Sequence, residues 1–468
     1  MFPPFPQENA HKKLKKLTNA IDRGELTLTQ VTEVSSEREG NGIMLGALVC
    51  KNSCGQEITL YAVSGIAKRL IPSGEFSLSD DEIIVPPLVS PQKIAQALSK
   101  NDAQIHKLTQ LINAEKETCH VTPAVAAHNL AELCEMRKKL TTESLQKVFD
   151  LYSFYCFDGK KITLAQIIKL HGGALPPTGT GDCCAPKLLS YAFEHNLQPL
   201  SMDEIFYGKN TKNKINGQSY PPCDERCGYI LPYILGLEIL YRDPWILVVN
   251  KQSGLLSVPG RTADKQDCIV TRMQKLFPET ISQPSVHRLD METSGLLVLA
   301  FTEEAHRNLN YQFSAGLVRK KYVALLEGVL NKAPGLSAPK NGLNVGRIQL
   351  KFRLDINNRP HQIYDEENGK LGITDWESLG TETYRFTSDD GVQHHFPATR
   401  VIYTPHTGRT HQLRLVSSDI HGFGLPIIGD TLYGNFQNGQ RLMLHSFLLE
   451  FTHPVTGQKM HFECKADF

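Results

Sequence analysis

The chain has 468 residues, of which 41% are hydrophobic and 21% are charged, proportions that are ordinary for a globular protein of two or three domains. Its formal net charge is only +1, so a polyanionic partner would have to be bound by a local basic surface. A run of about 18 apolar residues and a signal-peptide pattern are both missing, which argues against a helical membrane span. We therefore expect a cytoplasmic protein whose 11 cysteines are free thiols or metal ligands.

Residues 1–89 are expected to form an N-terminal extension that contains a β-hairpin. Its apolar runs, residues 43–49 and 57–63, flank the sequence Asn-Ser-Cys-Gly at residues 52–55, which has the composition of a hairpin turn. Residues 90–150 carry apolar side chains at helical intervals that Pro123 interrupts. This pattern predicts a helical hairpin or a short coiled coil, with its apolar stripe used for packing.

Residues 151–240 are rich in Gly, Pro and Cys and are expected to form a domain of their own. Cys184 or its neighbour Cys183, together with Cys223 and Cys227, could hold a structural zinc ion through three thiolates. The fourth ligand would then be His171, His195 or water. The alternative is that these cysteines are ordinary buried side chains.

The same cysteines are similar in arrangement to those of zinc-dependent nucleobase deaminases, but two departures argue against that activity. The second pair is Cys-x-x-x-Cys, which is one residue too long. The Glu expected two residues after the first ligand is replaced by Ala185 or Pro186, so no proton carrier is available at that position.

The last region, residues 241–468, is expected to be the catalytic domain. Apolar runs predict strands at residues 245–250, 296–300 and 322–326, and helical periodicity covers residues 268–277. Thr302 can cap a helix that ends near Gly316. Further strands are expected at residues 347–354, 369–376 and 398–403.

A polar loop comes directly before the buried strand at residues 296–300. It reads Val-His-Arg-Leu-Asp-Met-Glu-Thr-Ser-Gly at residues 286–295, so Arg288 and Asp290 are held by the end of a core strand. An ionised Asp beside a cation can act as a nucleophile. The alternative is that Arg288 and Asp290 form an ordinary surface salt bridge at a turn.

The longer pattern resembles the signature of the RluA family of pseudouridine synthases. Four further blocks match the family in order: residues 250–260, 321–324, 407–415 and 426–454. The resemblance implies an α+β fold, in which a catalytic domain with a mixed, mostly antiparallel sheet and a central cleft follows the helical and Cys-rich extension. It also implies catalysis without a cofactor on a stem-loop of rRNA or tRNA.

The resemblance also assigns roles to individual residues. Asp290 would be the nucleophile, Tyr322 a stacking residue and candidate general base, and Arg414, exposed after the turn at Thr407-Gly408, the partner that keeps Asp290 ionised. RNA contacts would fall to Arg288, His287, Arg409 and Lys321. One departure is the sequence Arg414-Leu415-Val416, where family members often have Arg-x-His, and it should affect local RNA contacts.

Two other functions stay open from the sequence. A non-catalytic RNA-binding factor would be expected to lack the nucleophile, whereas Asp290 is present. A two-activity enzyme would use its cysteine-rich region to modify a base. The oligomeric state is not indicated by any pattern.

Overall fold

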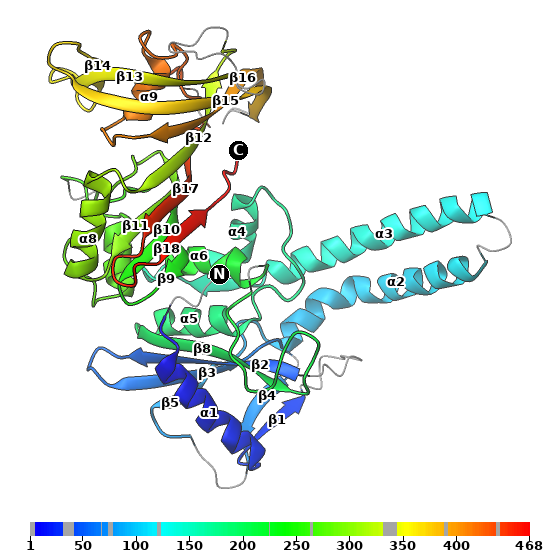
Figure 1. Ribbon diagram of the computed structural model, residues 1–468. Helices are drawn as coiled ribbons and strands as arrows, with labels where there is room; N and C mark the ends of the chain where they lie inside the picture. The colour runs from blue at the N-terminus through cyan, green and yellow to red at the C-terminus, as the bar shows by residue number, and fades with distance from the viewer. Residues whose placement is uncertain are drawn as a thin grey trace. The chain divides into compact units, whose positions relative to one another are not determined.

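The computed structural model describes residues 5–30, 42–66, 68–73, 78–118, 123–223, 225–262, 265–330, 344–387, 392–436 and 440–468. The chain divides into two compact units, Met1–Gly236 and Leu237–Phe468 (Figure 1). The expected boundary after residue 240 falls inside strand β9, which pairs with β10 of the second unit. Among the described residues, no helix combines the length and the hydropathy that crossing a bilayer requires.

The first unit is built on a four-stranded sheet with the order β5-β3-β2-β8. The hairpin expected near its start is present as β2 and β3, joined antiparallel through the turn at residues 52–55. Because β2 also pairs with β8, residues from both ends of this unit share one sheet. Its elements are α1 (Glu8–Asp22), β1 (Leu26–Gln30), β2 (Gly42–Lys51), β3 (Glu57–Val63), β4 (Lys68–Pro72), β5 (Glu82–Ile84), α2 (Pro91–Thr118), α3 (Pro123–Phe149), β6 (Ser153–Tyr155), β7 (Lys161–Thr163), α4 (Leu164–Leu170), α5 (Cys184–Glu194), β8 (Gln198–Gly208) and α6 (Cys227–Leu235).

Two long helices, α2 and α3, follow the strand β5 in the chain and lie side by side. They form the cyan arm in Figure 1. The side-chain amide of Asn101 on α2 donates to the carbonyl of Leu140 on α3 at 3.4 Å. These helices occupy the region where a helical hairpin was expected.

The second unit contains a ten-stranded sheet. Nine of its strands follow the order β14-β13-β15-β16-β12-β17-β11-β10-β9, and the tenth, β18, pairs with β17. Of its paired strands in the described residues, β11 and β17 run parallel and the other pairs are antiparallel, so the expected mixed, mostly antiparallel α+β fold is confirmed. Its elements are β9 (Glu238–Arg242), β10 (Ile246–Lys251), α7 (Ile269–Leu276), β11 (Ser294–Ala300), α8 (Glu303–Ser314), β12 (Arg319–Glu327), β13 (Asn344–Leu354), β14 (Gln362–Tyr364), β15 (Lys370–Thr387), β16 (Gln393–Pro405), α9 (Gln412–Ser418), β17 (Leu444–Thr452) and β18 (Lys459–Glu463).

This sheet carries two hydrophobic cores. One is made by apolar residues of β10, β11, β17 and α8. The other is made by apolar residues of β12, β13, β15, β16 and α9. Strands β12 and β17 pair with each other and so join the two halves, and the polar loops at the ends of β11, β12 and β16 meet between them.

Candidate active site

The loop that carries Asp290 is fixed where it enters β11. Every residue of β11 is buried, as expected for an apolar run inside a sheet. Gly295 has φ +110°, and a Cβ atom there would lie 2.3 Å from the backbone oxygen of Ser446. Only glycine fits this position, because Gly295 is paired directly with Ser446 where β11 and β17 run parallel.

A second segment, residues 251–257, is hydrogen-bonded to the same loop. The hydroxyl of Ser257 donates to the carbonyl of Leu289 at 2.7 Å and accepts the N–H of Leu289 at 3.0 Å. The hydroxyl of Ser253 donates to the carbonyl of Glu292 at 2.6 Å. The residues on either side of Asp290 are thus held by hydrogen bonds, which is the rigid support that a reactive group needs. This role of residues 251–257 was not predicted from the sequence.

Lys251 is the most buried cation of this support. It is 0% exposed, and its ammonium group donates to the carbonyls of Gln252, Leu255 and Met291 at 3.0, 2.6 and 2.9 Å. Burial lowers its pKa to about 7, while the negative charge of Asp290 acts in the opposite direction. Lys251 therefore connects the backbone of residues 252–255 to that of Met291, the residue after Asp290.

A cavity of about 750 Å³ opens above this loop, which is within the usual range for sites that enclose a small molecule. Its walls come from residues 286–293, from residues 310–322 and from residues 405–414. The described lining includes four Lys or Arg side chains and one carboxylate: Arg288, Lys320, Arg409, Arg414 and Asp290. A basic cavity with a single acidic group at its wall can bind a polyanion and still present one nucleophile.

Arg414 does not lie where the sequence suggested. It was expected to be exposed and paired with Asp290, but it is 2% exposed on α9 and forms its ion pairs with two other carboxylates. Its guanidinium group donates to both oxygens of Asp430, at 2.9 and 2.5 Å, and contacts Glu292 at 2.8 Å. Asp290 acts on Arg414 through its charge, and together these carboxylates raise the pKa of Arg414 against the effect of burial.

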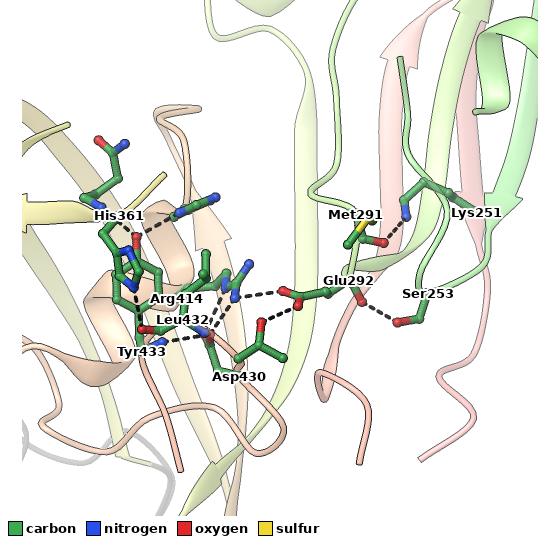
Figure 2. A network of polar contacts seen from close by, with 12 residues as sticks. Lys251, Ser253, Met291, Glu292, His361, Arg414, Asp430, Leu432 and Tyr433 are labelled. Atoms are coloured by element: carbon green, nitrogen blue, oxygen red, sulfur yellow. Dashed lines mark hydrogen bonds and ion pairs between the residues drawn. The ribbon is translucent and has the colours of Figure 1, made fainter. Parts of the chain in front are cut away.

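A network of polar contacts connects Arg414 and Asp430 to Glu292, which follows Asp290 in the same loop (Figure 2). Asp430, which is 0% exposed, accepts the backbone N–H groups of Leu432 and Tyr433 at 2.9 and 3.1 Å. Glu292, two residues after Asp290, accepts a hydrogen bond from Thr431. Glu292 therefore ties the Asp290 loop to the Arg414–Asp430 pair.

Tyr322 faces the cavity from β12. Burial raises the pKa of its phenol to about 12, and the nearby charge of Asp290 acts in the same direction. The side chain is thus a neutral phenol at neutral pH. It can stack against a base and donate a hydrogen bond, whereas accepting a proton would require prior ionisation.

The predicted RNA contacts fall into two groups. Arg288 and Arg409 line the cavity and are exposed. His287 lines it too, but its ring stacks on Phe313 with centroids 4.5 Å apart, and its Nε2 accepts the N–H of Val298 at 3.1 Å. Burial, with the charge of Lys320 adding to it, lowers the pKa of His287 to about 3, so this side chain is neutral and supports the loop.

Lys320, and not Lys321, is part of the described cavity lining. Side chains alternate between the faces of a strand, so Lys320 lies on the same side of β12 as Tyr322. The ammonium group of Lys320 lies 5.7 Å from the ring centre of Phe313. The alternation that placed Tyr322 could have identified Lys320 from the sequence.

In the first unit, the structure corrects the predicted set of thiol ligands. The sulfur atoms of Cys183, Cys223 and Cys227 lie within 4.8 Å of one another. Cys184 is not in this group, because it is 0% exposed and its thiol donates to the carbonyls of Met44 and Ala62 at 3.4 and 3.5 Å. The start of α5 turns the two neighbouring cysteines in different directions.

Neither histidine suggested as a fourth ligand belongs to this group in the described residues. His171 stacks on Tyr229, with ring centroids 4.0 Å apart. His195 stacks on Tyr191 and forms a hydrogen bond with its carbonyl at 2.8 Å. Both rings are used within the packing of the first unit.

Residues 245–419 match the family described as RNA pseudouridylate synthase. A Yersinia pestis protein named dual-specificity RNA pseudouridine synthase RluA is 40% identical over 233 residues, which are 49% of this chain and 99% of that protein. The protein of the same name from Escherichia coli strain K12 is 39% identical over 235 residues, covering 50% and 94% of the two chains. Among solved structures, human RNA pseudouridylate synthase domain containing 1 is 28% identical with a TM-score of 0.38, over 50% of this chain and 84% of that one.

Proposed function

The chain belongs to the RluA family of RNA pseudouridine synthases, since it covers nearly the whole length of relatives that are 40% identical to it, and from this membership we propose how it acts. It converts a uridine in a stem-loop of rRNA or tRNA into pseudouridine, with Asp290 as the nucleophile. The observation that carries the assignment of Asp290 is the cavity lining. In its described part Asp290 is the one carboxylate among four cations.

The reaction is an isomerisation. The glycosidic C–N bond breaks, the uracil turns, C1′ of the ribose forms a C–C bond to carbon 5, and the proton lost from carbon 5 is balanced by a proton taken up at N1. Electrons and atoms balance without an oxidant, a reductant or an energy-rich group, and pseudouridine synthases need no cofactor. A carboxylate held at the reacting centre supplies the covalent help that splits one difficult step into two easier ones.

The target uridine must leave its stack to enter the cavity. Turning a nucleotide out of the stack takes a few kcal/mol, and unstacked bases in loops require less than paired ones. Arg288, Arg409 and Lys320 supply positive charge along the walls, which favours the phosphates on either side of the turned nucleotide. Tyr322 offers an aromatic face for the base, and Arg414 holds positive charge near Asp290.

The names of the relatives support a proposal about the substrate class. They are named as dual-specificity enzymes, and we propose that this chain likewise accepts loops from rRNA and tRNA. A loop fits the cavity better than a continuous duplex, because A-form RNA keeps its bases stacked and its deep major groove closed to side chains.

The test replaces Asp290 by Asn, which keeps the shape of the side chain and removes its charge. Product formation is followed by tritium release from RNA labelled at carbon 5 of uridine. We expect a loss of at least about 10⁴-fold in rate with RNA binding retained, because the covalent step is removed. The exposed Glu367→Gln variant is the matched control and should turn over normally.

Two results would contradict the assignment. Normal turnover by the Asp290→Asn variant would show that another group is the nucleophile. Absence of turnover in the unchanged protein on every rRNA and tRNA loop of the cell, with binding intact, would favour a non-catalytic RNA-binding factor.

A further inference from the structure

Three cysteines from two distant segments meet in the first unit. Cys183 is the residue before α5, Cys223 lies in the loop before α6, and Cys227 is the first residue of α6. Their sulfur atoms all lie within 4.8 Å of one another. We propose that Cys183, Cys223 and Cys227 bind a zinc ion that fastens the start of α6 to the start of α5.

The spacing of the sulfur atoms suits a tetrahedral ion. With zinc–sulfur bonds of about 2.3 Å, two thiolates on one zinc ion lie about 3.8 Å apart. The sulfur atoms of Cys223 and Cys227 are 3.9 Å apart. Three sulfur ligands without a carboxylate select zinc over magnesium or calcium, which prefer oxygen.

The N-termini of α5 and α6 both begin at the cluster. Because the positive end of a helix stabilises nearby negative charge, this placement suits thiolates that bind a metal ion.

The fourth coordination position would be open to solvent. Cys227 is buried, Cys183 is half-buried and Cys223 is exposed, so one side of the cluster faces water. Glu204, a buried carboxylate, is not part of this group of ligand atoms, and its Oε1 accepts the N–H of Ala185 at 2.9 Å. Water is therefore the expected fourth ligand, and the Glu of a deaminase is replaced by Ala185 in the sequence.

The zinc ion would fix the start of α6 and stabilise the first unit. Helix α6 packs against α5 and α4, and Cys223 lies four residues before its first residue, Cys227. Five residues of α6 are buried, so the helix needs a fixed start in order to pack. A metal ion that binds the three assembled thiolates, and not the unfolded chain, adds its binding free energy to the stability of the first unit.

The experiment measures metal in the full-length protein, purified under reducing conditions without a chelator. We expect about one zinc per chain, and a cobalt-substituted sample should show the near-ultraviolet charge-transfer bands of bound thiolates. The adjacent cysteines provide a matched pair of variants. Cys183→Ser should lower zinc content or zinc affinity at least about tenfold, while Cys184→Ser should keep the ion, because serine can donate the same hydrogen bonds to Met44 and Ala62.

The proposal is independent of the synthase reaction and can fail on its own. A chain that carries no zinc and binds neither zinc nor cobalt would overturn it, and this measurement needs no variant to fold. Zinc lost in Cys184→Ser but kept in Cys183→Ser would overturn the ligand set. A Cys223–Cys227 disulfide in reduced cell extracts, detected by mass spectrometry, would also overturn it.

Discussion

Replacing Arg414 by Met should destabilise the second unit by about 3 kcal/mol, at the lower end of the range for breaking a buried ion pair. Arg414 is 2% exposed and Asp430 is 0% exposed, so Asp430 would keep a buried charge without its cation. The effect is moderated because Asp430 retains the N–H groups of Leu432 and Tyr433. The contact with the more exposed Glu292 should add at most about 1 kcal/mol.

Urea unfolding of the full chain, followed by a probe in the second unit, measures this effect. With a slope of about 2–3 kcal/mol per molar urea for a unit of this size, the midpoint should fall by about 1 M. The double variant Arg414→Met/Asp430→Asn should recover most of this stability, because both charges are then removed while the Asn side-chain oxygen can still accept the N–H groups of Leu432 and Tyr433. It should remain inactive, because Asp290 has lost a nearby cation. Full activity in the double variant would refute the electrostatic role, and an unchanged midpoint in the single variant would refute the buried pair.

Three further outcomes are expected. Gly295→Ala should lower the free energy of unfolding by at least about 3 kcal/mol, measured with urea, because the residue has positive φ and its Cβ would meet Ser446. The unchanged protein should gain stability as the pH rises from 7 to 10, because the pKa of Lys251 is lowered to about 7 in the folded state and the unfolded chain therefore binds more protons over this range. The Lys251→Met variant should lack this gain. Tyr322→Phe should bind RNA with unchanged affinity but release tritium at least about 10²-fold more slowly. The rate of the unchanged protein should not rise between pH 7 and 9. A rate that increases by one log unit per pH unit over this range would contradict a role for the neutral phenol.

Much of the second unit could be predicted from the sequence, because its elements are set by local patterns. The apolar run before Phe301 became the fully buried β11, and Thr302 caps α8 by accepting the N–H of Ala305 at 3.2 Å. The position of Asp290 at the cavity follows from the same logic, since a polar loop that enters a buried strand is held at one end. The order of the motifs indicated the family, and the resemblance to that family predicted the mixed, mostly antiparallel sheet.

The partners of charged residues could not be predicted in this way. Arg414 was assigned to Asp290 because the motif names those two residues, but the pairing with Asp430 depends on how residues 426–433 fold back against α9. The choice between Cys183 and Cys184 depended on the direction in which each side chain leaves the start of α5, which spacing alone does not determine. Lys251 carried no signal, because a lysine in an apolar strand is ordinarily exposed.

The protonation state of Tyr322 limits the part it can play in the reaction. With a pKa of about 12, only about one molecule in 10⁵ carries the phenolate at pH 7, which adds about 7 kcal/mol to any step that begins from that form. A barrier increase of that size would remove much of an enzyme's advantage. The neutral phenol, in contrast, is available in every molecule and can hold the base by stacking and by donating a hydrogen bond. In the proposed mechanism, Tyr322 can therefore remove the proton from carbon 5 only after its own proton has moved away within the covalent complex. The proposed attack by Asp290 would remove the carboxylate charge that opposes ionisation of the phenol.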